Sequence, residues 1–138
     1  MKTTKKIATI MAAAVIAVVF MFGNAALAQQ AKAKAWPVPD KDKAMKSAAK
    51  ADVATGKELW AKHCKSCHGS KGLGDGPKAA SLKTNPGDFS SAAFQSGTDG
   101  EIFYRTDKGR DEMPAYEKKI PDINDRWALV AFMRTFKK

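Results

Sequence analysis

The sequence has 138 residues, with 24 basic and 14 acidic side chains and a formal net charge of +10. This length allows one domain at most, and two cysteines are too few for a disulfide framework. The positive excess bears on partners and encounter rates rather than on fold.

The amino-terminal segment has the composition of a secretory signal peptide. Lysines precede an uncharged run over residues 7–22, and Ala-Leu-Ala follows at 26–28 as a small-x-small cleavage site. We expect residues 1–28 to be a signal peptide and the protein to be exported. An uncleaved membrane anchor is the alternative, although the run is short for a bilayer, which needs about 20 apolar residues.

Residues 29–54 form a lead-in that is rich in lysine and alanine. Low aromatic content and the two prolines of Trp36-Pro37-Val38-Pro39 favour an extended or partly helical segment with little core of its own. Trp36 either packs on the domain surface or marks a docking point.

The next segment carries the strongest motif of the chain. Thr55-Gly56-Lys57-Glu58 has the form of a capping box and predicts a helix from Thr55 into Cys64. Cys64-Lys65-Ser66-Cys67-His68 is then a c-type haem attachment motif. Two thiols on one helical turn can each add across a haem vinyl group, and the histidine is held under the iron. The motif predicts one covalent haem c bound by Cys64 and Cys67, with His68 as an iron ligand.

Two other chemistries use the same residue types. A redox dithiol needs a βαβ setting, which the sequence does not suggest. A zinc site needs four nitrogen or sulfur donors, and outside the motif only His63 remains.

Residues 69–77 contain four glycines, which disfavour a helix or a strand. We expect a tight loop that lets backbone approach a neighbour closely. A phosphate-binding loop is the alternative, but no strand precedes it and no Gly-Lys-Ser/Thr ending follows.

The rest of the sequence predicts short helices joined by long loops. A helical turn is expected at 92–95. A helix is expected from residue 100 to about 108, with a capping box at Thr98 before it and Gly109 at its end. A last helix, capped by Asp122, is expected over 123–136. No convincing period-two stretch occurs. The sequence therefore predicts an all-α domain over 55–138, whose small core leaves room for a large apolar cofactor.

Three side chains of the mature chain could bind the iron opposite His68. His63 is fused to the attachment helix, and Met133 lies on the apolar stretch of the last helix, where a thioether usually fills core gaps. Met113 precedes Pro114, which keeps it off helical geometry, on a loop 45 residues after His68. Met113 is the preferred candidate.

With Gly56 and Trp60 ahead of the motif, a Gly-Asp-Gly-Pro loop after it, Met113-Pro114 and an aromatic-rich final helix, residues 55–138 resemble a class I cytochrome c. More narrowly, they are similar to the small bacterial monohaem cytochromes c and to related haem modules of respiratory complexes. The resemblance implies thioether bonds at Cys64 and Cys67, and His68 and Met113 as the axial ligands.

The resemblance also implies details of packing. The first and last helices are expected to cross at Gly56, near Phe132, and to pack against each other around the haem. The carbonyl of Pro77 is expected to accept a hydrogen bond from Nδ1 of His68, which would fix the orientation of the imidazole.

The function expected from these features is one-electron transfer in the periplasm between respiratory redox proteins. A fixed haem subunit of a membrane complex is the alternative, and an open-site haem enzyme or gas sensor is a third reading that requires Met113 not to bind. No nucleic-acid partner and no small-molecule substrate at the iron are expected. Acidic partners are expected if the lysines near the motif surround the haem edge, namely Lys65, Lys71, Lys78 and Lys83.

Overall fold

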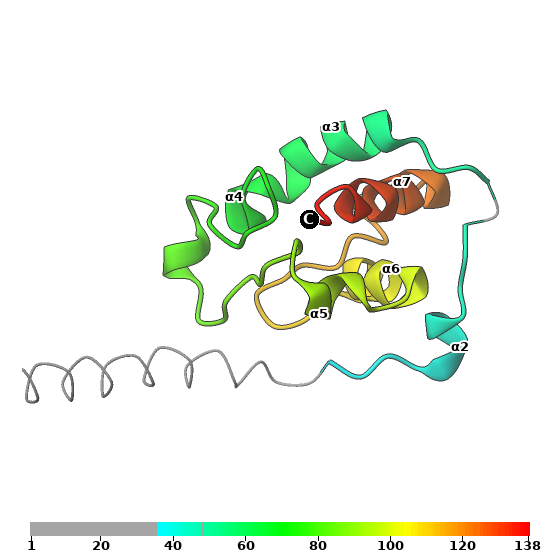
Figure 1. Cartoon of the computed structure of the whole chain (residues 1–138), viewed down its shortest axis with the longest axis horizontal. Helices are drawn as coiled ribbons and strands as arrows, with labels where there is room; N and C mark the ends of the chain where they lie inside the picture. The colour runs from blue at the N-terminus through cyan, green and yellow to red at the C-terminus, as the bar shows by residue number, and fades with distance from the viewer. Residues whose placement is uncertain (1–35, 48) are drawn as a thin grey trace, which may run out of the picture. The chain divides into compact units, whose positions relative to one another are not determined.

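The computed structural model of the protein describes residues 36–138 except 48, so the predicted signal peptide lies outside the described residues. Residues 37–138 pack as one compact unit. Within the described ranges the only β-type contact is an isolated bridge between Arg110 and Met113, and the predicted all-α fold is confirmed. The helical segments in chain order are α2 (Asp40–Lys43), α3 (Val53–His63), α4 (Lys65–His68), the 3-10 turn η1 (Ala79–Ser81), α5 (Ala92–Gln95), α6 (Asp99–Lys108) and α7 (Ile123–Arg134) (Figure 1).

Helix α3 begins at Val53, before the capping box that the sequence suggested at Thr55. Asp52 is the N-cap: its carboxylate accepts the N–H of Ala54 at 2.9 Å and the hydroxyl of Thr55 at 2.7 Å. The predicted start was wrong because the carboxylate of Asp52 satisfies the first turn, which makes Thr55 a donor inside the helix rather than its cap.

Helices α3 and α7 run side by side (Figure 1). A Cβ atom at Gly56 would collide with the backbone carbonyl of Ala128 and would lie 2.9 Å from Cβ of Phe132. Only glycine permits this approach, since any side chain would push the two helices apart. The expected crossing of the first and last helices at Gly56, near Phe132, is confirmed.

The core lies between α3, α6, α7 and the loop that precedes α7. Leu129 is fully buried, and Phe103 stacks on Trp127 with ring centroids 4.1 Å apart. Met133 belongs to this buried cluster, as expected of a thioether that fills core space. The buried members of the cluster are Trp60, Ile102, Phe103, Tyr116, Ile120, Trp127, Leu129, Val130 and Met133.

The caps predicted for the last two helices are formed. Thr98 and Glu101 make a reciprocal capping box at the start of α6, and Gly109 ends this helix at φ 59°. Asp122 caps α7. Helix α7 ends at Arg134, somewhat before the predicted end.

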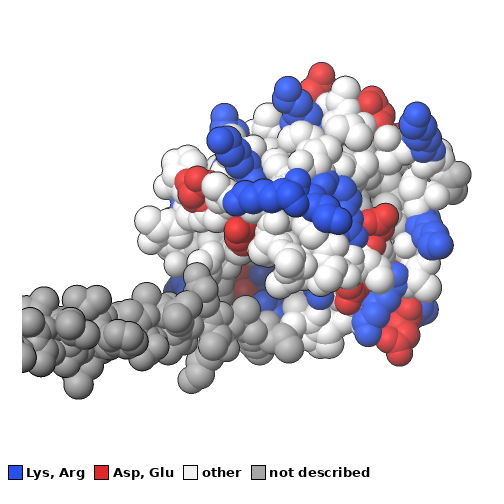
Figure 2. Space-filling model, viewed as in Figure 1, with Lys and Arg blue, Asp and Glu red and all other residues white. Residues whose placement is uncertain are grey.

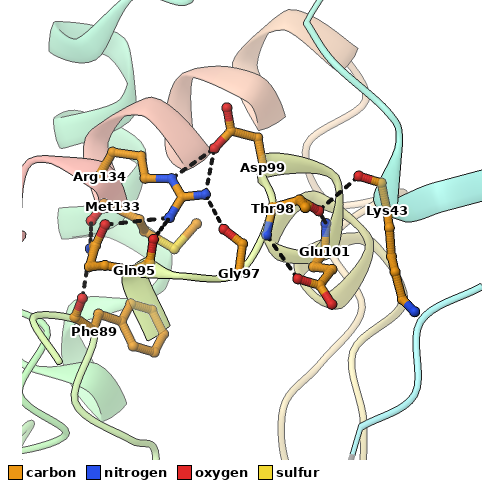
Figure 3. A network of polar contacts seen from close by, with 9 residues as sticks. All are labelled: Lys43, Phe89, Gln95, Gly97, Thr98, Asp99, Glu101, Met133 and Arg134. Carbon is orange, nitrogen blue, oxygen red and sulfur yellow. Dashed lines mark hydrogen bonds and ion pairs between the residues drawn. The ribbon is translucent and has the colours of Figure 1, made fainter. Parts of the chain in front are cut away.

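Arg134 joins the end of α7 to the start of α6 (Figure 3). Its guanidinium lies 2.7 Å from the carboxylate of Asp99 and donates to the carbonyls of Gln95 at 3.0 Å and Gly97 at 2.6 Å. The Gln95 amide donates in turn to the carbonyl of Phe89 at 2.7 Å. The network therefore fixes the position of Phe89, which matters for the site described below.

The lead-in packs on the domain from Pro37 onward. Val38 is buried, helix α2 contacts α6, and the Thr98 hydroxyl donates to the carbonyl of Lys43 at 2.8 Å. The expectation of a partly helical segment with little core of its own holds for this part. Among the described residues, none of the helices has the length and hydropathy of a membrane-spanning segment.

Candidate haem site

The two cysteines and the histidine of the motif share one helical turn. Cys64 ends α3 and caps α4, and its carbonyl accepts the N–H groups of Cys67 at 3.1 Å and His68 at 3.0 Å. Both cysteines are free and half-buried. This places two thiols and one imidazole on adjacent positions of a turn, as covalent haem attachment requires.

Cys64 does not have the character of a redox-active thiol. Burial raises the pKa of Cys64 to about 12. Reactive Cys-x-x-Cys pairs have lowered pKa values because the thiolate is the nucleophile. The dithiol alternative is therefore not supported. The zinc alternative is not supported either, because the described residues contain no group of three or more His, Cys, Asp or Glu side chains that could hold a metal ion.

Aromatic rings surround the imidazole of His68. The ring centroid of Phe89 lies 4.7 Å from that of His68, and that of Trp60 lies at 5.8 Å. Phe89 is itself stacked on Phe94 at 4.2 Å. Burial lowers the pKa of His68, which favours the neutral imidazole that binds iron.

The hydrogen bond predicted between His68 and Pro77 is not formed. Nδ1 of His68 is buried without a hydrogen-bond partner among the described residues. The backbone of Pro86, not of Pro77, interacts with this imidazole and partly offsets the lowering of its pKa by burial. Pro77 was matched by its spacing from His68 alone, and spacing does not determine which backbone segment lies near the imidazole.

Pro77 instead lies in a loop that folds back on the attachment turn. The N–H of Gly76 donates to the carbonyl of Cys67 at 3.2 Å, and the N–H of Lys78 donates to that of Ser66 at 2.8 Å. A Cβ on Gly76 would lie 2.5 Å from the Ser66 carbonyl oxygen. The predicted close approach of the glycine-rich loop is confirmed, and its neighbour is the motif itself.

Met113 lies on a turn, as the following proline predicts. Its N–H and carbonyl pair with the carbonyl and N–H of Arg110 at 2.9 and 2.8 Å, and its side chain is half-buried. Between them, Asp111 has a φ of 51°. Ligation of iron by Met113 stays a prediction.

The structure adds Tyr116, which the sequence analysis did not select. Its hydroxyl donates to the carbonyl of His63 at 2.8 Å, next to Cys64. The rings of His63 and Tyr116 meet edge to face at 5.9 Å, which agrees with an edge-packed His63. Burial raises the pKa of Tyr116 to about 12, so the phenol stays a donor. In the sequence only its position shortly after Met113-Pro114 singles out Tyr116. Its contact with His63 joins residues 53 positions apart, which the sequence does not reveal.

These residues fit a covalently bound haem. The chain presents two half-buried thiols and a neutral imidazole, and Nδ1 of this imidazole is buried without a hydrogen-bond partner among the described residues. Cysteine thioethers and one histidine are the donor set of haem c.

Comparisons with known proteins agree with this fit. The family model described as "Cytochrome C oxidase, cbb3-type, subunit III" matches residues 51–133. A solved structure described as "KustC0563 c-type cytochrome" is similar at 30% identity and a TM-score of 0.52, covering 60% of this chain and 98% of that chain. No curated protein matches.

A second solved structure shows the fold alone. It comes from the "Kuenenia stuttgartiensis reducing HAO-like protein complex Kustc0457/Kustc0458", with 24% identity and a TM-score of 0.60. The match covers 76% of this chain and 53% of that one, so this chain spans about half the length of that neighbour. Because the matched residues make up more than half of the sequence and include the attachment motif, in which Cys64 and Cys67 lie, the chain belongs to this cytochrome c family and is a monohaem c-type cytochrome with a covalent haem c.

Proposed function

We propose that this cytochrome is exported to the periplasm and carries one electron at a time between respiratory redox partners, with His68 and Met113 as the axial ligands of the haem iron. One observation carries the proposal. Tyr116, which follows Met113 closely on the same loop, bonds to His63 immediately before Cys64. The loop of the proposed ligand is thereby held beside the attachment motif.

The chemistry follows from the two ligands. A bound haem supplies one-electron exchange between ferric and ferrous iron, and a thioether ligand raises the reduction potential relative to a second histidine. The neutral imidazole of His68 is held among Phe89 and Trp60. If His68 and Met113 both bound the iron, no position would remain for a substrate, and the haem would exchange electrons by outer-sphere transfer.

Export is part of the proposal because haem is attached to such motifs outside the bacterial cytoplasmic membrane. The predicted signal peptide over residues 1–28 supports it. The mass of the protein recovered from the periplasm tests cleavage: it should correspond to a chain that begins at residue 29 and carries one haem.

Acidic redox partners are proposed from the lysines near the motif. Lys65, Lys71 and Lys78 are exposed, as is Lys83. Figure 2 shows that on the viewed face basic side chains are interleaved with acidic ones, so any attraction has to come from a local cluster rather than from the whole face. Electron transfer to an acidic partner should slow as salt rises, and a rate that ignores ionic strength would count against this steering.

A fixed subunit of a respiratory complex is the second candidate. The description of the family and the redox complex that contains the second structural neighbour support it. The lead-in at Trp36-Pro37-Val38-Pro39 would then be the docking segment. Pro37 and Pro39 are exposed and could contact a partner, whereas Val38 is buried. Fractionation separates the two candidates: a shuttle is released with the periplasm, whereas a subunit stays with the membranes.

Carbon monoxide tests the outer-sphere mechanism. The reduced, exported protein is mixed with a small inorganic oxidant in a stopped-flow instrument, with and without carbon monoxide. The proposal predicts the same oxidation rate in both cases, since Met113 blocks access to the iron. Slower oxidation with carbon monoxide would favour the third reading, an open-site haem enzyme or gas sensor.

A further inference from the structure

We propose that Tyr116 is a positioning residue that holds the loop of Met113 against the haem-attachment turn, and thereby limits how often Met113 leaves the iron. The inference rests on the proposed ligation by Met113. It assigns to this tyrosine a role that lies outside the attachment motif and outside the axial ligands themselves.

Tyr116 is held both by its backbone and by its side chain. Its N–H donates to the carbonyls of Thr106 and Asp107, at 3.2 and 3.1 Å, at the end of α6. Its side chain is buried in the core, with 7% of the residue exposed. The hydroxyl then reaches His63, 53 positions earlier in the chain, at 2.8 Å. The residue therefore joins the Met113 loop to two helices at once.

The acceptor of this bond is a helix end. The last carbonyls of an α-helix lack partners within the helix, and His63 is the final residue of α3. The phenol of Tyr116 satisfies its carbonyl. On the other side of the motif, the indole N–H of Trp60 donates to the carbonyl of Gly69 at 3.0 Å. Two aromatic side chains thus bracket the attachment turn, and Tyr116 is the one that belongs to the Met113 loop.

The turn that carries Met113 has its own source of strain. Asp111 adopts a φ of 51°, in the region that favours glycine, between the paired residues Arg110 and Met113. A strained turn persists where surrounding contacts hold it. Tyr116 supplies one of these contacts on the carboxyl-terminal side of Met113.

Removing the hydroxyl should loosen the loop without emptying the core. Tyr116→Phe keeps the ring and loses only the bond to His63. We expect the fraction of protein with Met113 off the ferric iron to rise about fivefold, which corresponds to the loss of one typical hydrogen bond. An added ligand that binds only the open form should then associate about fivefold faster.

The experiment uses the full-length exported holoprotein. Imidazole is mixed with the ferric wild type, Tyr116→Phe and Tyr104→Phe, and the association rate is followed by absorbance. Tyr104 is the matched control: it is the only other tyrosine of the chain and lies half-buried on α6. We expect faster association in Tyr116→Phe alone. Equal rates in all three proteins would overturn the proposal, as would a Tyr116→Phe protein that unfolds earlier but binds imidazole at the wild-type rate.

The outcome also separates this proposal from the proposed ligation. If the ferric wild type lacks the red-region sulfur-to-iron absorption band, Met113 ligation fails and this inference fails with it. If the band is present and Tyr116→Phe leaves imidazole binding unchanged, only the role of Tyr116 fails.

A second measurement does not depend on the yield of Tyr116→Phe. In the Tyr104→Phe background Tyr116 is the sole tyrosine, so the NMR signal of isotope-labelled tyrosine reports its surroundings alone. In rising urea, we expect exposure of Tyr116 and loss of the sulfur-to-iron band to follow the same transition. Loss of the band while Tyr116 stays buried would contradict the proposal.

Discussion

Glu112 and Thr84 lie 28 positions apart in the sequence, yet Oε2 of Glu112 accepts both the N–H of Thr84 at 3.1 Å and its hydroxyl at 3.3 Å. The same oxygen accepts the N–H of Lys83 at 2.7 Å. Glu112 directly precedes Met113, and residues 83–84 lead to Pro86, whose backbone acts on His68. One carboxylate therefore connects the Met113 side of the site to the His68 side.

Replacing Glu112 by alanine removes this acceptor. The bonded groups lie at the surface, where water competes, so we expect the free energy of unfolding of the holoprotein to fall by about 1 kcal/mol. Urea unfolding measures the change. Glu58→Ala, at an exposed position of α3, is the control and should stay within about 0.5 kcal/mol of the wild type. Equal losses in the two variants would show that the Glu112 contact adds nothing specific.

Gly56→Ala should be far more damaging. Its methyl group would meet the backbone of Ala128, which cannot move without separating α3 from α7. We expect a loss of about 3 kcal/mol in the free energy of unfolding, at the upper end of overpacking effects. In Gly97→Ala, the matched control, the new methyl group would lie 3.0 Å from a side-chain oxygen of Glu101 rather than inside a backbone carbonyl, and the change should cost much less. Similar unfolding midpoints for the two variants would contradict the tight crossing.

The effects of Pro86 and Pro77 on the surroundings of His68 can be compared directly. In Pro86→Ala the carbonyl remains, but the ring no longer fixes the local backbone. We expect the loosened segment to admit water to the buried imidazole, so that the Nδ1 proton of His68, followed by NMR in the ferrous protein, exchanges with water faster than in the wild type. Pro77→Ala should leave this rate unchanged. The opposite ranking would restore Pro77 as the partner.

Met113→Ala tests the distal ligand. Haem should stay attached, because Cys64, Cys67 and His68 are untouched, while the sulfur-to-iron band disappears and the reduction potential falls. Met133→Leu is the control: it changes a buried thioether of the core at similar volume and should keep the band. A band that survives in Met113→Ala would rule out Met113 as the ligand.

The parts of this protein that were predictable from sequence are local. The attachment motif, the capping box at Thr98 and the end of α6 at Gly109 each depend on residues within one or two turns, and the structure forms all three helical features. Gly56 was predicted through resemblance, since a glycine by itself does not reveal which helix approaches it. The start of α3 was misjudged because Asp52 and Thr55 are both good caps, and only the folded chain shows which one is used.

The contacts that were missed join distant segments. Tyr116 reaches His63 across 53 positions, and Glu112 reaches Lys83 across 29. Neither side chain belongs to a spaced motif, and a tyrosine or glutamate in a loop is ordinary. The absence of the predicted bond between His68 and Pro77 has the same reason, because spacing from His68 does not specify which part of the long loop lies near the imidazole.

Absorption spectroscopy of the purified, exported protein tests the central claim most directly. Spectra are recorded in the ferric and ferrous states, before and after addition of carbon monoxide. We predict a c-type haem spectrum, a red-region sulfur-to-iron band in the ferric state and no change of the ferrous spectrum with carbon monoxide. A colourless protein would contradict covalent haem, and a ferrous spectrum shifted by carbon monoxide would contradict an iron closed on both sides by His68 and Met113.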